Sequence, residues 1–327
     1  MTAFLKALAL VGALGIGVVQ AQEIKPAVIF DMGGKFDKSF NEAAYNGAEK
    51  FKAETGIDYL EFEITNESQR DQALRRMAQR ADIVVAVGFA FSTPLEKVAA
   101  EFPDKKFVII DSQVDQPNIR SVQFKEHEGS FLVGMAAALK SQTGKVGFVG
   151  GMDIPLIRNF AFGYEQGVKH VNPNAQLIVN FTGTTPAAWT DVSRAKELAI
   201  SQMDQGADVI YAAAGQAGLG ALEAAADAKK YSIGVDSNQN YLHPGSVLTS
   251  MIKRVDVAVY NAFTDAKNGS WQPGAQNLGL KEQGVDYAVD EYNKDILTAD
   301  MRAKIDEAKQ AIIAGQIEVK DYYSTQQ

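Results

Sequence analysis

Cysteine is absent from the 327 residues of this chain, and histidine occurs only three times. Without cysteine the protein has no disulfide framework, and no cysteine is present to carry a lipid at a mature N-terminus. The three histidines do not stand in an HExxH-type spacing, so a zinc site has few ligands to draw on. We therefore expect no metal site, no cofactor and no lipid anchor.

The chain also lacks an excess of basic residues. Its 32 lysines and arginines face 40 aspartates and glutamates, which gives a net charge of −8. The basic residues are scattered among the acidic ones, so the sequence offers no footprint for nucleic acid or for anionic lipid. A neutral or cationic solute therefore fits better than a polyanion. With 46% hydrophobic and 22% charged residues, the chain is typical of a globular protein large enough for two domains.

Long hydrophobic runs are missing as well. The longest one, residues 7–19, falls short of the roughly 20 apolar residues that a helix needs to cross a bilayer. Lys6 precedes this run, and small or modest residues follow it at the −3 and −1 positions of a signal-peptidase site that ends at Ala21. We expect residues 1–21 to be a signal peptide, and we expect the mature protein to be free in the periplasm.

From residue 27 onward, short apolar runs alternate with segments of helical periodicity. The mainly apolar runs 27–31, 83–88 and 107–111 are typical of strands buried on both faces, and helical segments lie between them. The same alternation starts again at residue 129 and continues to residue 236. This order predicts an α/β fold with two doubly wound parallel-sheet lobes.

No long linker rich in proline, glycine or serine separates the two series. We therefore expect the chain to pass between the lobes through short segments near 123–125 and near 236–240, which together would form a hinge. We assign residues 22–124 with about 238–280 to the first lobe. Residues 125–237 with about 281–327 are assigned to the second lobe.

Aspartates follow three of the predicted strands. Ligands of such sheets bind beyond the carboxyl ends of the strands, and Asp31, Asp111 and Asp236 stand directly at those ends. Each aspartate is expected either to contact a ligand, or to cap the next helix or make a hinge hydrogen bond. We favour ligand contact for Asp236, because its carboxylate would accept hydrogen bonds from vicinal hydroxyl groups, and we leave both alternatives open for Asp31 and Asp111.

Two loops that lead from a strand to a helix carry aromatic residues. Phe36 lies just before a predicted capping box of Ser39 and Glu42, and Trp189 lies in the loop 181–191. One ring from each lobe could stack on a flat ligand. A third loop, which starts at Gly215, matches neither a P-loop nor a dinucleotide fingerprint. It is expected to be an ordinary helix start whose backbone N–H groups could bond a neutral ligand.

Four segments of the sequence resemble the basic membrane protein family, whose members are substrate-binding components of ABC transporters with the type 1 periplasmic binding protein fold. The matching segments are residues 31–41, 148–155, 233–239 and 248–256, and the resemblance runs from about 25 to 319. Several members of this family bind purine nucleosides. The resemblance implies a non-enzymatic protein, which we expect to be a monomer, that captures a small solute and delivers it to an ABC transporter permease.

Carried over by position, the resemblance also implies roles for single residues. Phe36 and Trp189 would sandwich a base, and Asp236 with Lys253 would hold the ribose hydroxyls. Three further residues would lie around the ligand: Asp31, Asn41 and Asp111. This chain departs from the family in two ways: many members start with a lipid-bearing cysteine, and related chains often have phenylalanine where this one has Trp189.

Other ligands and other functions stay open at this point. Pyrimidine nucleosides, flat riboflavin-like molecules and sugars are alternatives to a purine nucleoside. A solute sensor of the same fold that signals to a membrane receptor would have a similar cleft. A nucleoside hydrolase would need an acidic metal cluster or an activated nucleophile, and the scattered strand-end aspartates do not form a recognised set of this kind.

Overall fold

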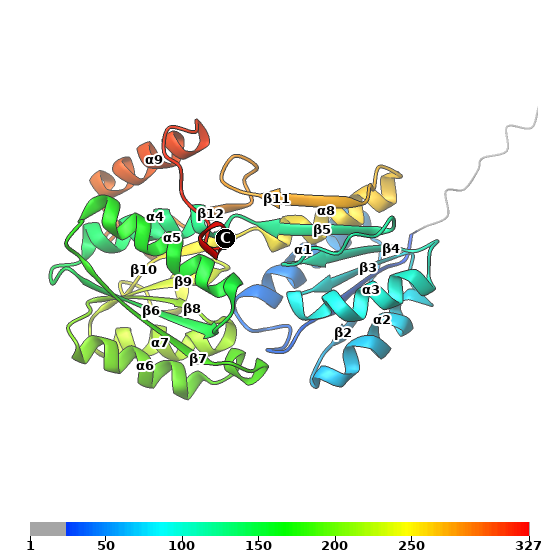
Figure 1. Cartoon of the computed structure of the whole chain (residues 1–327), viewed down its shortest axis with the longest axis horizontal. Coiled ribbons are helices and arrows are strands. Elements are labelled where there is room, and N and C mark those ends of the chain that lie inside the picture. Colours follow the sequence, from blue (N-terminus) through cyan, green and yellow to red (C-terminus); the bar gives the residue numbers. More distant parts are fainter. Residues whose placement is uncertain (1–23, 327) are drawn as a thin grey trace, which may run out of the picture.

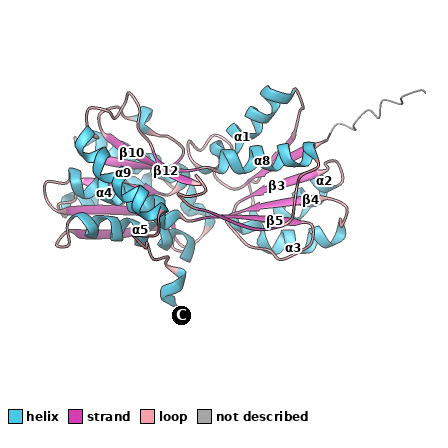
Figure 2. Cartoon of the chain, turned by 90° about the horizontal axis from the view of Figure 1, so that it is seen from above, coloured by secondary structure: helices cyan, strands magenta, loops and turns pink. Residues whose placement is uncertain are grey.

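The computed structural model describes residues 24–326, so the predicted signal peptide lies outside the described residues. Two six-stranded sheets, each covered by helices on both faces, form two lobes (Figure 1). Seen from above, the lobes lie side by side and are joined through a narrower waist (Figure 2). The predicted α/β fold with two parallel-sheet lobes is confirmed.

The first lobe is built on a sheet with the order β11-β5-β4-β3-β1-β2, in which all pairs are parallel. Alternate residues of the buried strands face opposite helix layers: Val28 and Val85 pack toward α1 and α8, whereas Ile29 and Val84 pack toward α2 and α3. The elements of this lobe are β1 (Pro26–Phe30), α1 (Phe40–Thr55), β2 (Leu60–Glu63), α2 (Arg70–Ala78), β3 (Ile83–Val87), α3 (Ser92–Glu101), β4 (Lys106–Ile110), β5 (Ile119–Phe124), α8 (Val255–Asn268) and β11 (Gly274–Leu278).

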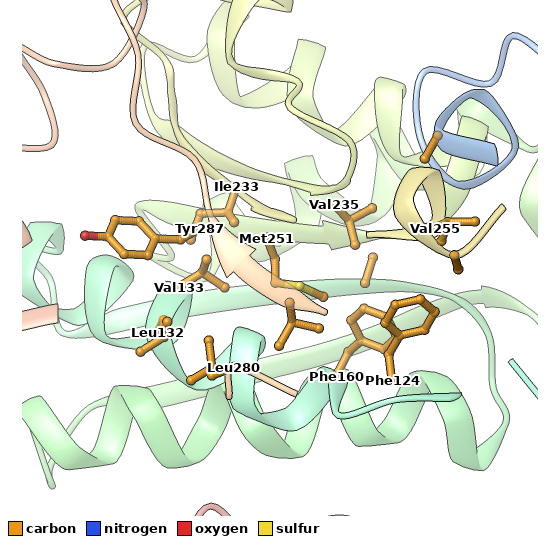
Figure 3. Packing of buried hydrophobic residues seen from close by; sticks show 14 of the residues in the cluster. Phe124, Leu132, Val133, Phe160, Ile233, Val235, Met251, Val255, Leu280 and Tyr287 are labelled. Atoms are coloured by element: carbon orange, nitrogen blue, oxygen red, sulfur yellow. The ribbon is translucent and has the colours of Figure 1, made fainter. Parts of the chain in front are cut away.

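The second lobe repeats this plan with the strand order β12-β10-β9-β8-β6-β7. Only β12 runs antiparallel to its neighbour, β10. Helices α6 and α7 cover one face, and on the other face Leu132 and Val133 of α4 lie near Met251 of β10 (Figure 3). The elements are α4 (Glu126–Lys140), β6 (Lys145–Met152), α5 (Pro155–Val171), β7 (Gln176–Gly183), α6 (Val192–Asp204), β8 (Val209–Ala213), α7 (Gly218–Asp227), β9 (Tyr231–Asp236), β10 (Val247–Lys253), β12 (Val285–Tyr287) and α9 (Ala299–Ile313).

The chain crosses between the lobes three times. It crosses at Lys125, where the sequence predicted a crossing, again at Arg254, and finally through residues 279–284. The crossing expected near 236–240 is wrong, because β10 pairs in parallel with β9 and thus stays in the second sheet. Assigning all of 238–280 to the first lobe was therefore wrong for β10.

No helix within residues 24–326 is both long enough and apolar enough to span a membrane.

Candidate functional site

A cavity lies between the two lobes, at the carboxyl ends of strands from both sheets. The predicted site residues that line it are Asp31, Asn41, Asp111, Trp189, Gly215, Asp236 and Lys253. Strands β1, β4 and β9 end directly before or at the three aspartates. Parallel strand direction places Asp31 and Asp111 at one edge of the first sheet, and the facing of the two lobes brings Asp236 of the second sheet to the same cavity. The structure thus brings together residues that are up to 222 positions apart in the sequence, Asp31 and Lys253.

Phe36 is the exception, since it does not line this cavity. Its side chain is 58% exposed and packs edge-to-face on Tyr45, with ring centroids 5.3 Å apart. Lys35 Nζ lies 5.1 Å from the same ring. These neighbours hold Phe36 on the outside of the first lobe, so the predicted pairing of Phe36 with Trp189 across a ligand is not formed in this arrangement.

Other apolar residues form the walls that Phe36 was expected to supply. They are Met32, Phe40 and Phe89 in the first lobe and Leu156, Ile157 and Phe160 in the second. The sequence analysis missed them because Phe40 and Phe160 fall on apolar helix faces, where an aromatic ring usually packs in the core. Only the convergence of two lobes places these rings at a cavity.

Trp189 reaches the cavity from a short 3-10 turn, Pro186–Trp189. The loop is pinned by Thr182, whose hydroxyl donates to Ala188 O at 2.8 Å. The ring lies directly over Gly151, where an added Cβ would come within 2.2 Å of Trp189 Cζ3. Glycine at position 151 is therefore a requirement for this position of the indole ring.

Asp31 is held by an arginine and by Asn41. Arg70 donates to Asp31 Oδ1 from Nε at 3.1 Å and from Nη2 at 2.7 Å. Asn41 pairs with the Asp31 backbone, accepting from its N–H at 3.1 Å and donating to its carbonyl at 3.3 Å. Burial raises the pKa of Asp31, and the guanidinium of Arg70 only partly offsets that rise. Both bonds from Arg70 go to Oδ1, so the second carboxylate oxygen of Asp31, Oδ2, is not bonded by Arg70. This oxygen lies on the side of Gly88.

Lys253 is the centre of a buried charged cluster. Its Nζ lies 2.7 Å from the carboxylate of Asp111 and 3.1 Å from Glu126 Oε1. Burial alone would lower the pKa of Lys253, but the surrounding carboxylates outweigh it and raise the pKa. Burial raises the pKa of Glu126 to about 7, even with Lys253 beside it. The sequence did not identify Glu126 as part of this charged cluster, because a glutamate in the first turn of a helix such as α4 is usually a surface residue.

Asp236 lies at the other end of this cluster. Ser39 Oγ donates to Asp236 Oδ2 at 2.5 Å, and burial raises the pKa of Asp236 to about 6 against the lowering effects of Lys253 and Ser39. Asp236 and Asp111 both have left-handed backbones, with φ of 63° and 66°, at the ends of β9 and β4. Aspartate tolerates this conformation better than most residues.

At α1, the helix that follows Asp31, the capping considered for that aspartate is performed by a different residue. Asp37 accepts hydrogen bonds from the backbone N–H groups of Ser39, Asn41 and Glu42 at the start of α1. The predicted capping box of Ser39 and Glu42 is wrong, because Ser39 makes no side-chain cap and Glu42 accepts from the N–H of Lys38 instead.

Nearly the whole described chain matches a family model. Residues 24–322 match the model of the ABC transporter substrate-binding proteins described as PnrA-like. The chain belongs to this family. Substrate-binding proteins of ABC transporters bind small solutes and interact with permeases, which agrees with a cavity between two lobes. The resemblance to the basic membrane protein family stated from the sequence is confirmed.

Named relatives support the assignment. The chain is 32% identical to basic membrane protein A of Borreliella burgdorferi over 96% of this chain and 92% of the relative. It is 36% identical to a protein named uncharacterized lipoprotein of Pyrococcus furiosus, over 84% of this chain and 73% of the relative. That name describes the relative as a lipoprotein, whereas we expect this chain to carry no lipid anchor.

A solved structure shares the architecture. The crystal structure of an ABC transporter solute-binding protein from Aeropyrum pernix K1 superposes with a TM-score of 0.82 and 31% identity, covering 90% of this chain and 92% of that one.

Proposed function

We propose that this protein captures a purine nucleoside between its lobes and delivers it to an ABC transporter permease. The observation that carries the proposal is that apolar residues, among them Trp189, and three strand-end carboxylates line the same cavity. A nucleoside combines a flat base, which apolar and aromatic residues suit, with polar base edges and sugar hydroxyls, which carboxylates suit.

The base would lie against the indole of Trp189 and the neighbouring apolar residues. An offset or edge-to-face aromatic contact contributes ~1 kcal/mol beyond area burial. Asp31 Oδ2 would accept a hydrogen bond from an N–H group at the edge of the base, while Arg70 holds the other oxygen. The backbone at Gly215, which also lines the cavity, would bond the base from the second lobe.

The ribose would lie against Asp236, with Asp111 and Lys253 next to it. Hydroxyl groups are donors, and a charged acceptor makes the stronger hydrogen bond with them. A phosphorylated ligand fits poorly, because Lys253 is already paired with Asp111 and Glu126 and Arg70 is paired with Asp31. A neutral nucleoside is therefore a better ligand than a nucleotide.

Mass spectrometry of the small molecule that co-purifies with the protein tests the proposed ligand. Calorimetry with guanosine, inosine, uridine, riboflavin and ribose then ranks the candidates. We expect purine nucleosides to bind best and to be recovered intact after incubation. Preferred binding of ribose alone, or release of free base from inosine, would contradict the proposal.

We also propose that the protein is exported, cleaved after Ala21 and free in the periplasm as a monomer. The supporting observations are the short apolar run 7–19 and the absence of cysteine. N-terminal mass analysis of periplasmic material should find Gln22 as the first residue. An intact Met1 in the cytoplasm would overturn the export proposal.

A further inference from the structure

The serine that stands at the start of α1 does not cap that helix. Serine is among the preferred N-cap residues, because its hydroxyl usually accepts a hydrogen bond from a backbone N–H of the first turn. Here Ser39 makes no such bond, and Asp37 accepts from the first-turn N–H groups instead. The hydroxyl of Ser39 is therefore available for another partner, although the side chain is completely buried.

That partner lies in the other lobe. Ser39 Oγ is 2.5 Å from Asp236 Oδ2 and 3.3 Å from Val235 O, at the end of β9. In return, Ser237 Oγ donates to Ser39 O at 2.8 Å, and Gln239 Nε2 donates to Lys38 O at 3.0 Å. We call these interlobe bonds the Ser39 latch.

The second lobe presents its half of the latch on a fixed frame. Gln239 is 1% exposed, its Oε1 accepts from Val235 N at 2.8 Å, and its own N–H donates to Ser250 Oγ at 2.9 Å. A Cβ at position 234 would come within 2.6 Å of Gln239 Oε1, so Gly234 leaves the space that this arrangement needs. The second lobe thus positions Val235 and Gln239 by itself, whereas the carboxylate of Asp236 receives its side-chain hydrogen bond from Ser39 of the first lobe.

We propose that Ser39 is a positioning residue that acts through Asp236 and couples closure of the two lobes to recognition of the ligand's hydroxyl groups. This inference rests on the proposed nucleoside function, in which Asp236 is the acceptor for the ribose. The serine fixes Oδ2 of the carboxylate. Among the described residues Asp236 Oδ1 receives no hydrogen bond, so it is the oxygen available to the ligand.

The coupling follows from where the two partners lie. Ser39 belongs to the first lobe and Asp236 to the second, so their bond exists only when the lobes are closed. When the lobes are closed, this bond restricts the rotation of the Asp236 carboxylate before the ligand hydroxyls bind to it. The latch therefore increases the affinity for a ligand that binds Asp236 in two ways: it stabilises the closed lobes, and it fixes the orientation of the acceptor.

A double-mutant cycle tests this inference. Calorimetry measures the affinity for inosine of four proteins: wild type, Ser39→Ala, Asp236→Asn and the double variant. Asparagine is chosen at position 236 because it keeps the shape of the side chain and tolerates the left-handed backbone. Ser39→Ala should weaken binding roughly tenfold, because a hydrogen bond to a charged group is lost. In the Asp236→Asn background, the same change should weaken binding by about threefold or less.

Ser237→Ala is the matched control, because it removes an interlobe bond of similar length that does not involve Asp236. Ser237→Ala should weaken inosine binding by the same factor in the wild-type and in the Asp236→Asn protein. Thermal unfolding without ligand checks that each variant is folded. A tenfold loss from Ser39→Ala in both backgrounds, or wild-type affinity of Ser39→Ala, would overturn the inference.

A second measurement separates this inference from the proposed function. If wild type binds no nucleoside at all, the proposed function fails, and small-angle scattering of the ligand-free proteins still tests the latch. Ser39→Ala should then have a larger radius of gyration than wild type, while Ser201→Ala, an exposed serine of α6, should not. Equal radii for Ser39→Ala and wild type would overturn the latch itself.

Discussion

Each strand-end aspartate at the cavity is held by a different partner. Asp31 is bound by Arg70, Asp111 by Lys253, and Asp236 by the neutral hydroxyl of Ser39. A cationic partner neutralises much of a carboxylate's charge, whereas a hydroxyl does not. Asp236 therefore keeps the most acceptor strength for a ligand, and it is the residue at which substitution should change specificity.

The first prediction concerns Asp236→Asn. This change keeps the shape of the side chain but replaces a charged acceptor by a neutral amide, which costs ~1.5–3 kcal/mol per charged hydrogen bond or roughly 10- to 100-fold in affinity for a nucleoside. For the 2′,3′-dideoxy analogue, which lacks those hydroxyls, the loss should be much smaller. Calorimetry with both compounds measures the difference, and an equal loss for both would assign Asp236 to the hinge rather than to the ribose.

Trp189→Ala provides the complementary prediction. Removing the indole takes away an apolar face without touching the carboxylates, so affinity should fall by a similar factor for the nucleoside and for its dideoxy analogue. We expect roughly a tenfold loss, from the stacking contribution and the lost area together. Isothermal titration of both ligands checks it, and a loss confined to the complete nucleoside would show that the indole acts on the sugar.

The raised pKa of Asp236 predicts a pH dependence of binding. Its pKa is about 6, because burial outweighs Lys253 and Ser39, while Asp111 and Asp37 raise it further. Protonation removes the charged acceptor, so nucleoside affinity should be full above pH 7 and should fall as the pH drops through 6. Titrations between pH 5 and 8 measure this, with Asp236→Asn as the control that should flatten the profile. An unchanged profile in Asp236→Asn would assign the dependence to another group.

The sequence identified most of the polar residues that line the cavity, but it missed Asp37 and Gln216 and did not reveal which residues bond the three aspartates. The position of Asp31, Asp111 and Asp236 after apolar strands predicted that they line the cavity, because ligands of such sheets bind beyond the carboxyl ends of the strands and the two sheets face each other with those ends. Local pattern could not predict that Glu126 would be buried against Lys253, since β10 and α4 come together only in the folded lobe. Phe36 lies away from the cavity for a local reason: a packing partner, Tyr45, is present on α1, the helix that follows its loop.

At the scale of elements, the sequence predicted the helices and strands inside each lobe better than the places where the chain passes from one lobe to the other. Residues 238–280 were assigned together to the first lobe, whereas within them the chain forms β10 in the second sheet, crosses at Arg254 and begins α8 in the first lobe. Both elements carry apolar residues, so periodicity alone gives no sign of the lobe change. Strand β5 was missed because buried polar residues, Arg120 and Ser121, interrupt its apolar pattern.

The close contact between α4 and α5 gives the element-scale prediction. Gly167 of α5 lies against the α4 backbone, and an added Cβ would come within 2.0 Å of Phe131 O. Gly167→Ala should force the helices apart and cost ~2–3 kcal/mol, a fall of several degrees in Tm. Gly218→Ala is the control, because its Cβ would meet nothing closer than 3.4 Å. Thermal unfolding by circular dichroism compares them, and equal Tm values would contradict the packing argument.

At the scale of the whole molecule, the three crossing segments are bonded to one another. Lys125 N donates to Leu278 O at 3.0 Å, and Arg254 N donates to Gly284 O at 2.8 Å. These bonds tie the three crossings together at the hinge, while the Ser39 latch lies at the cavity, between the facing loops that precede α1 and follow β9. A molecule that is tied at the hinge and latched at the cavity opens by rotation of one lobe about the other.

The last prediction is that ligand shifts this rotation toward the closed state. The radius of gyration from small-angle scattering should decrease when inosine saturates the protein, because a ligand bound by both lobes stabilises their closed arrangement. The absence of cysteine allows dyes to be placed on two introduced cysteines, one in each lobe, at the exposed positions Asp58 and Glu197. Energy transfer between these dyes should change on ligand addition. For a control pair at Glu197 and Lys304, both in the second lobe, it should stay constant. An unchanged radius together with unchanged transfer between the lobes at saturation would mean that the site is rigid and that the latch is a permanent interlobe contact.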